Sequence, residues 1–236
     1  MLLGDFIVIQ AGFDVVLALY LLVWPTVAMA LLGFMSPNPL SILGGSRVFS
    51  LAVAYEVGFA LSLLTPVAMS AALRSPAFSI YAASLTSWRL WTNPLTAVPM
   101  ALALATALIS LQCKLMEKPF DIPEAETEIV AGPFTEYSGP KLALIIILHD
   151  VELFVGSTLI AFIFLGGPYP FTQTWWSSAL TFLVKYLLVV ATLTAIKAAV
   201  ARFRVDQALL LFWRYIIPLS LLSLIAASAL LHLSIM

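Results

Sequence analysis

The sequence has few charged residues, one cysteine and two histidines. Charged residues make up 10% of its 236 positions and hydrophobic residues 62%, whereas a soluble domain carries about 25% charged and about half apolar residues. Because this leaves too little polar surface to cover a water-soluble globule, we expect the chain to reside in a bilayer. The net charge of −1 offers no basic patch for nucleic acid.

The scarcity of metal ligands excludes several kinds of centre. Cys113 alone cannot form an internal disulfide or a four-thiolate cluster, and His149 and His232 are too few and too far apart to indicate a haem or metal site. We therefore expect no cofactor bound by this chain alone, so that any electron carriers belong to partner subunits. The N-terminal MLLGDF lacks the basic region of a cleaved signal peptide.

Six apolar runs are long enough to cross a hydrocarbon core, which takes about 20 helical residues. No internal repeat or low-complexity segment is apparent, and the segments between the runs are rich in proline, glycine, serine or charge. The sequence predicts an all-α, polytopic transmembrane helix bundle that forms a single integral membrane domain, 1–236. The predicted spans lie near 6–34, 47–71, 95–115, 141–166, 178–201 and 207–233.

The distribution of lysine and arginine predicts the orientation of the bundle. Basic residues are enriched in short cytoplasmic loops, and with six spans the first, third and fifth loops share one side. That side and its flanks hold six basic residues, against Arg74 and Arg89 on the other. We expect both termini outside and the long acidic loop in the cytoplasm. The six are Arg47, Lys114, Lys118, Lys141, Arg202 and Arg204.

The loop 114–141 carries half of the twelve acids of the chain. Asp121-Ile-Pro-Glu124 fits a capping box and predicts a short helix over about 122–131, which would place Glu124 and Glu128 on one face. Like charges so placed destabilise a helix by roughly 0.2–0.5 kcal/mol, so the pair favours a basic partner or proton exchange. The alternative is a solvated loop. The loop acids are Glu117, Asp121, Glu124, Glu126, Glu128 and Glu136.

Ionisable residues also occur inside the apolar runs. A charge at the centre of a membrane helix costs about 2.5–3.5 kcal/mol, so such groups usually face protein or water. Ion or proton passage is the favoured interpretation, and structural pairing is the alternative, with Lys197 able to snorkel to the interface. Tyr55-Glu56, Pro66 and Pro99 suggest bent or interrupted helices, or simple packing. The residues are Asp14, Glu56, His149, Asp150, Glu152, Lys185 and Lys197.

Four segments resemble one known family. PFDIPEAETEIVAGPFTEYSG (119–139) is similar to the signature of the H subunit of respiratory complex I, a type of membrane protein that also forms the membrane foot of energy-converting [NiFe]-hydrogenases and related ferredoxin-linked complexes. SPNPLSILGGSRVFSLAVAYE (36–56), FLGG (164–167) and ARFRVDQALLLFWRYIIPLSL (201–221) agree with the family in order and spacing. The resemblance covers nearly the whole chain from about residue 36.

The resemblance implies a subunit, non-catalytic alone, that docks a peripheral redox module and couples its electron transfer to proton or sodium translocation. Asp121, Glu124, Glu126 and Glu128 would form the coupling loop, Glu56 an intramembrane relay, and Glu136 the acid of the Glu-Tyr-Ser-Gly turn. Arg204 and Asp206 would belong to the last cytoplasmic loop, at the docking surface. His149, Asp150, Glu152 and Lys185 complete the ion-translocation candidates.

The implied partners are an iron–sulfur small subunit, a large hydrogenase-type subunit and antiporter-like membrane subunits, in a prokaryotic plasma membrane with its lipids. Iron–sulfur clusters and a NiFe centre would lie in those partners. Two departures from the quinone-reducing members bear on this: His149-Asp150 stands where they read Glu-Tyr, and Glu117-Lys118 where an arginine precedes PFD. Family members also have about two further N-terminal spans, which here would lie on another polypeptide or be absent from an abridged subunit.

Three functions follow as hypotheses. A hydrogenase-type, ferredoxin-linked complex is favoured by the loop EAETEIVAGPFTEYSG and by DVELF (150–154). A quinone-site subunit of a complex I-like oxidoreductase is the alternative within the family. A stand-alone ion transporter is the third, although such folds often contain internal repeats.

Overall fold

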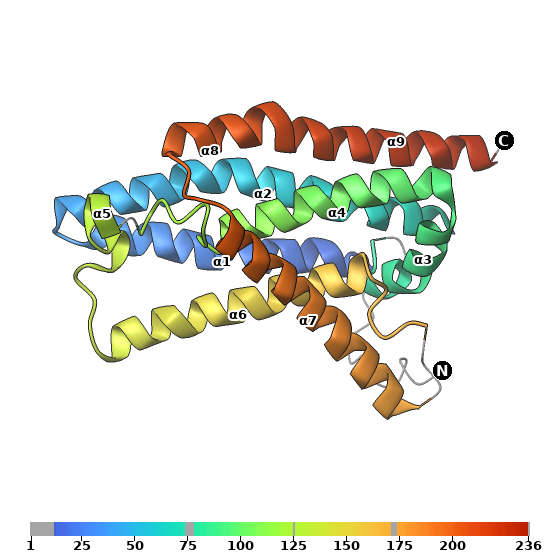
Figure 1. Cartoon of the computed structure of the whole chain (residues 1–236), viewed down its shortest axis with the longest axis horizontal. Helices are drawn as coiled ribbons and strands as arrows, with labels where there is room; N and C mark the ends of the chain where they lie inside the picture. The colour runs from blue at the N-terminus through green and yellow to red at the C-terminus, as the bar shows by residue number, and fades with distance from the viewer. Residues whose placement is uncertain (1–11, 74–77, 125, 171–173, 236) are drawn as a thin grey trace.

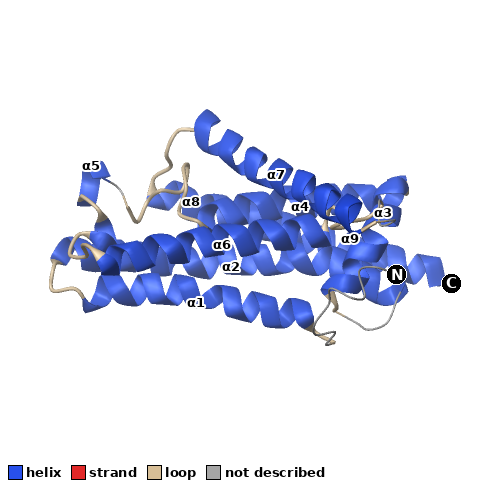
Figure 2. Cartoon of the chain, turned by 90° about the horizontal axis from the view of Figure 1, so that it is seen from below, coloured by secondary structure: helices blue, strands red, loops and turns tan. Residues whose placement is uncertain are grey.

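The computed structural model describes residues 12–73, 78–124, 126–170 and 174–235, and over these residues the chain is helical, with no strand (Figures 1 and 2). Six helices are long and apolar enough to span a membrane, which confirms the predicted bundle. Positions 6–11 of the first predicted span lie outside the described residues. The spans are α1 (Asp14–Met35), α2 (Pro39–Leu73), α4 (Pro94–Lys114), α6 (Pro140–Ile163), α7 (Trp175–Ala199) and the last span, Val205–Leu230.

Proline or a side-chain cap begins most of these helices. Pro39, Pro94 and Pro140 are the first residues of α2, α4 and α6, positions where the missing N–H costs nothing because it has no intrahelical acceptor. The Thr174 side chain accepts a hydrogen bond from the Ser177 N–H at the start of α7. The segments expected to be loops between spans therefore also contain the starts of the helices.

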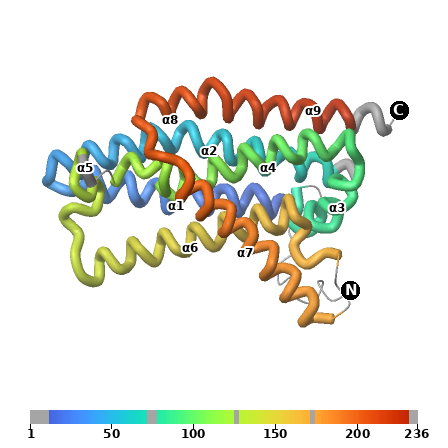
Figure 3. Tube along the Cα trace, viewed as in Figure 1, coloured from blue at the N-terminus to red at the C-terminus, as the bar shows by residue number. Residues whose placement is uncertain are grey.

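Helix α2 is the centre of the bundle, with α1, α4 and α9 (Ile217–Ile235) packed along it (Figure 3). It begins eight residues before the predicted boundary at 47. A Cβ on Gly44 would lie 2.6 Å from Pro133 Cδ, so a glycine is needed where the acidic loop packs onto this first part of α2. Helix α7 runs obliquely away from the other spans and is mostly exposed (Figure 1).

Two elements were not predicted. Helix α3 (Ile80–Thr92) is too short to span a membrane and lies between the second and third spans. The last span contains a π-helical segment, Phe212–Ile216, between α8 (Val205–Leu211) and α9. Pro218 lacks the N–H that would bond the carbonyl of Arg214, four residues earlier, which favours irregular winding there. Pro66 and Pro99, in contrast, lie inside helices that continue past them.

The prediction of a helix over 122–131 is wrong. Residues 121 and 122 have no regular structure and 123 and 124 form a turn, and among the described residues of this stretch only α5 (Glu126–Ile129) and a 3-10 turn (Gly132–Phe134) are helical. The reason is tertiary packing: Ile122 is buried with Phe120 against the last span, and Arg47 Nη1 donates to the Ile122 carbonyl at 3.3 Å, which takes up the start of the expected helix. Glu124 therefore precedes α5 and does not share a helix face with Glu128.

Candidate functional site

A cluster of ionisable residues lies inside the bundle, where α1, α2, α4 and α6 meet. The last residue of α4, Lys114, is fully buried and forms an ion pair with Glu56 of α2. Lys114 Nζ also lies 3.5 Å from Glu152 Oε1 of α6, an ion pair without hydrogen-bond geometry. We call Thr26, Tyr55, Glu56, Lys114 and Glu152 the inner cluster.

Hydroxyl groups complete the inner cluster. Tyr55 Oη donates to Thr26 Oγ1 at 3.1 Å, and Thr26 Oγ1 donates to Glu56 Oε1 at 3.3 Å. Lys114 Nζ lies 5.4 Å from the centre of the Tyr55 ring, within the range of a cation–π contact. One buried ammonium therefore serves two carboxylates, so that a proton arriving on either carboxylate changes the charge balance of all three groups.

A second set of charges lies one helical turn closer to the loop. Glu117 Oε2 lies 2.5 Å from Lys197 Nζ of α7, and Glu117 Oε1 lies 3.8 Å from His149 Nε2 of α6. His149 and then Lys197 hold the pKa of Glu117 below its usual range, against the opposing effect of partial burial. We call Glu117, His149 and Lys197 the outer triad.

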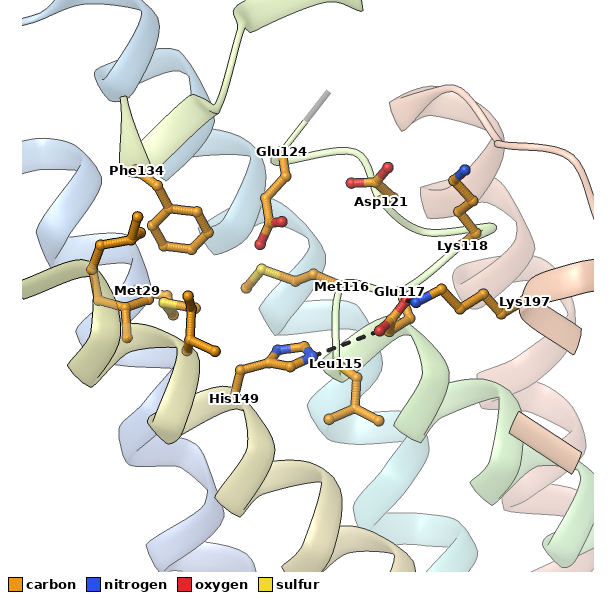
Figure 4. Close-up of a pocket in the computed structure, with 13 residues that line it drawn as sticks. Met29, Leu115, Met116, Glu117, Lys118, Asp121, Glu124, Phe134, His149 and Lys197 are labelled. Atoms are coloured by element: carbon orange, nitrogen blue, oxygen red, sulfur yellow. Dashed lines mark ion pairs between the residues drawn. The ribbon is translucent and has the colours of Figure 1, made fainter. Parts of the chain in front are cut away.

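The outer triad forms part of the wall of a cavity of about 440 Å³ beneath the acidic loop (Figure 4). We call it the loop cavity. Glu124 and Asp121 line it from the loop, with Met29, Met116 and Phe134 among its apolar walls. Burial raises the pKa of Glu124 from its ordinary value to about 7, with further contributions from the neighbouring Asp121 and Glu117 carboxylates. Glu124 is therefore the loop acid best suited to exchange a proton near neutral pH.

Two segments lead from the loop cavity to the inner cluster. On α6, Glu152 follows His149 by three residues, and residues three apart lie on the same side of a helix. Glu117 lies three residues beyond Lys114, in the turn that follows the end of α4. The two sets of charges therefore lie near one another along the same pair of segments.

Glu128 and Glu136 hold the loop in place. Glu128, at the surface, lies 2.6 Å from Arg47 Nη1, and this guanidinium lowers the pKa of Glu128. Asn38 Nδ2 donates to Glu136 Oε1 at 2.9 Å. Gly132 has φ +50°, and a Cβ there would lie 1.9 Å from the Pro123 carbonyl oxygen, so the loop requires glycine at this turn. The loop is folded against α1 and α2, and Glu128 and Glu136 remain exposed on its outer side.

Several predicted residues lie away from these clusters. Asp150 is exposed on the outer side of α6 and makes no ion pair with another described residue. Lys185 donates to the carbonyls of Leu165 and Tyr169, which follow α6. Asp14 lies in the first turn of α1, where it accepts a hydrogen bond from Ser79. The side chain of Glu126 lies outside the described residues.

Arg204 and Asp206, the predicted docking residues, lie at the start of α8. With Glu128 and Arg202 they line a depression of about 320 Å³ at the loop end of the bundle. Phe203, which directly precedes Arg204, donates its N–H to the Pro119 carbonyl at 2.9 Å, and the centre of its ring lies 5.7 Å from that of Phe120. The last span and the acidic loop therefore share one surface.

The sequence analysis missed Lys114 and Thr26 as members of the site. Lys114 ends an apolar run, the usual position of an interfacial lysine, and nothing local distinguishes a lysine that folds back into the bundle. Lys197, expected as a candidate for snorkelling, binds Glu117 instead. The sequence did offer one indication of Lys114. Charges inside a membrane bundle are usually paired, so the intramembrane acids Glu56 and Glu152 require a basic partner.

Comparison with known proteins gives consistent matches. The NADH dehydrogenase family profile matches residues 2–228. The H subunit of the NADH-quinone oxidoreductase of Geobacillus kaustophilus is 33% identical over 201 residues, covering 85% of this chain and 58% of the relative. The corresponding protein of Carboxydothermus hydrogenoformans is 29% identical over 197 residues, covering 83% and 54%. The chain thus spans little more than half the length of these relatives.

A solved structure has the same arrangement of helices. A chain of the membrane-bound sulfane sulfur reductase, an archaeal respiratory membrane complex, superimposes with a TM-score of 0.70 at 28% identity, covering 84% of this chain and 64% of that one. These matches agree with the family resemblance on which the expected role of the loop was based.

Proposed function

The chain belongs to the NADH dehydrogenase family, and from this membership we propose that it is the membrane subunit of a complex I-like respiratory complex. In this role it docks a peripheral iron–sulfur module at the loop end and couples electron transfer there to translocation of protons or sodium ions. The subunit is non-catalytic alone. The observation that carries the proposal is the succession of titratable groups from Glu124, which shares the loop cavity with the outer triad, to Glu152, which is paired inside the bundle.

The series supports coupling because its members differ in their access to water. Burial raises the pKa of Glu124 to about 7 at the loop cavity, and the outer triad lines the same cavity. The inner cluster holds two carboxylates on one lysine, so a proton moving between Glu152 and Glu56 requires no new charge in the bundle. A charge change near the docked module would shift these equilibria by Coulomb interaction.

The finer proposal is a hydrogenase-type, ferredoxin-linked complex with a NiFe or related centre in its large subunit. The sequence supports it, because His149-Asp150 and Glu117-Lys118 depart from the quinone-reducing members. The loop cavity has a mixed lining, with ionisable residues such as Glu117 and His149 facing apolar ones such as Phe134 and Ile145, and it fits either type. The two relatives argue against a ferredoxin-linked complex, because both are H subunits of NADH-quinone oxidoreductases. A quinone-site subunit is therefore the second candidate.

The test of coupling uses the intact complex reconstituted in liposomes. In the Glu124→Gln and Glu56→Gln variants we expect ion uptake per electron to fall at least severalfold, while the complex stays assembled. Asp14→Asn, which removes a carboxylate at the opposite end of the bundle, is the matched control and should leave the ratio unchanged. An unchanged ratio in both glutamine variants would refute the role of the series.

The electron acceptor is tested separately, in the same membranes. Ferredoxin-dependent hydrogen evolution or sulfur reduction without quinone reduction supports the ferredoxin-linked type. Ferredoxin- or NADH-dependent quinone reduction that is lost with Glu117→Gln would support the second candidate instead.

A further inference from the structure

A basic groove lies beside the candidate site, at the loop end of α7. It is a cavity of about 560 Å³ between the loop segment 118–121 and the segment 197–202. Its cationic side chains are Lys118, Lys197 and Arg202, and they face one carboxylate, Asp121, among the described residues that line it. The excess of positive charge suits an anion.

Two of the three cations are available to a ligand. Lys197 binds Glu117. Lys118, in contrast, is exposed and makes no ion pair with another described residue. Arg202 Nη2 is buried and has no hydrogen-bond partner within the described part of the chain. Because an orphaned buried guanidinium nitrogen is costly, this arginine favours a ligand that accepts hydrogen bonds.

The position of the groove indicates where that ligand comes from. The 25-residue apolar helix α7 ends at Ala199, so Arg202 lies just beyond the hydrocarbon core, at the depth of lipid headgroups. The flank of α7 leading away from the groove is apolar and exposed, with Leu183, Val184, Leu187 and Leu188 each about half accessible. The basic groove is therefore continuous with a surface suited to acyl chains.

We propose that this groove binds the phosphate of an anionic phospholipid whose acyl chains lie along α7. Basic pockets at the ends of membrane helices recognise such headgroups, and the two forks of a guanidinium match phosphate oxygens. The lipid would fill the angle between α7 and the rest of the bundle, where α7 has few protein neighbours (Figure 1). This inference does not depend on the electron acceptor of the complex.

The test measures lipid retention by the detergent-extracted complex after transfer to nanodiscs of phosphatidylcholine with or without phosphatidylglycerol. Native mass spectrometry counts bound phosphatidylglycerol. We expect Lys118→Gln and Arg202→Gln each to weaken its binding about fivefold. Lys141→Gln removes an exposed lysine from the same end of the bundle, outside the groove, and should leave binding unchanged.

Three results would overturn the proposal. The first is equal loss of lipid in Lys141→Gln, which would indicate a diffuse surface effect. The second is binding of inorganic phosphate that displaces phosphatidylglycerol and is itself weakened by Lys118→Gln and Arg202→Gln. This result would identify a free anion as the ligand. The third is release of the peripheral subunits from Arg202→Gln with phosphatidylglycerol still bound, which would assign the groove to an acidic protein partner.

Discussion

The inner cluster and the outer triad share α6, but the inner cluster is more deeply buried, with Glu152 5% and Glu56 20% exposed. Lys114 is fully buried, whereas Glu117 and His149 are each about a quarter exposed and Lys197 about half exposed. In the outer triad, solvent screening and hydration limit what each ion pair is worth. In the inner cluster, removal of one partner leaves a charge without compensation. We therefore expect substitutions in the outer triad to cost less stability than substitutions in the inner cluster.

Lys114→Met should have the largest effect. It leaves the buried Glu152 and the partly buried Glu56 without their cation, and breaking a buried pair in this way costs about 3–5 kcal/mol. We expect the complex to unfold at a markedly lower temperature and to lose ion uptake. The triple variant Lys114→Met/Glu56→Gln/Glu152→Gln should recover most of the stability without the uptake. A triple variant as unstable as the single one would contradict this account of the cluster.

Glu124→Gln should have the next largest effect, and the effect should depend on pH. The pKa of Glu124 is about 7, so between its ordinary value and 7 the folded chain holds a proton that the unfolded chain releases. The free energy of unfolding contributed by this group therefore falls as pH rises through that window, by up to about 3 kcal/mol. The measurement is the unfolding temperature from pH 5 to about pH 8, with Asp14→Asn as control. Equal slopes in wild type and Glu124→Gln would exclude a raised pKa.

Lys197→Met tests the outer triad, and its effect should be smaller. The Glu117–Lys197 pair is partly exposed, so a double-mutant cycle with Glu117→Gln should give a coupling of about 1 kcal/mol. Because the pKa of Glu117 is lowered, its stabilising contribution is present above its ordinary pKa and is lost as pH falls through the lowered value. A coupling energy as large as the cost expected for Lys114→Met would remove the distinction between the inner cluster and the outer triad.

Glu128→Gln should have the smallest effect on stability. Its ion pair with Arg47 is at the surface, and such pairs contribute little, less still at high salt. We expect an unfolding temperature close to that of wild type at high salt. A large, salt-independent loss would mean that Arg47 acts mainly through this acid and not through its bond to the Ile122 carbonyl.

Hydropathy predicted the six spans because a helix that crosses a bilayer must be long and apolar wherever it lies in the fold. The loop helix was wrong because Ile122 and Phe120 gain more by burial against the last span than the chain gains from a local capping box. Glu56 was identified as an intramembrane acid because depth alone marks it. Lys114 was missed because only the packed bundle shows that its side chain points inward from the end of α4. His149 and Asp150 are adjacent in sequence, and only the orientation of α6 shows that His149 faces the loop cavity while Asp150 is exposed.

The π segment Phe212–Ile216 has a mechanical consequence. Phe120 of the acidic loop packs on Phe212 at 5.6 Å, and on its other side the segment meets α2, where a Cβ on Gly58 would lie 3.2 Å from Ile216 Cγ2. Gly58 is two residues from Glu56. Close-packed interiors have little room to absorb a shift, so the position of the loop and the backbone that holds Glu56 are linked by steric contact. The loop is thus connected to the inner cluster in two ways. One is the succession of titratable groups, and the other is the packing of uncharged side chains through Phe120, Phe212 and Ile216.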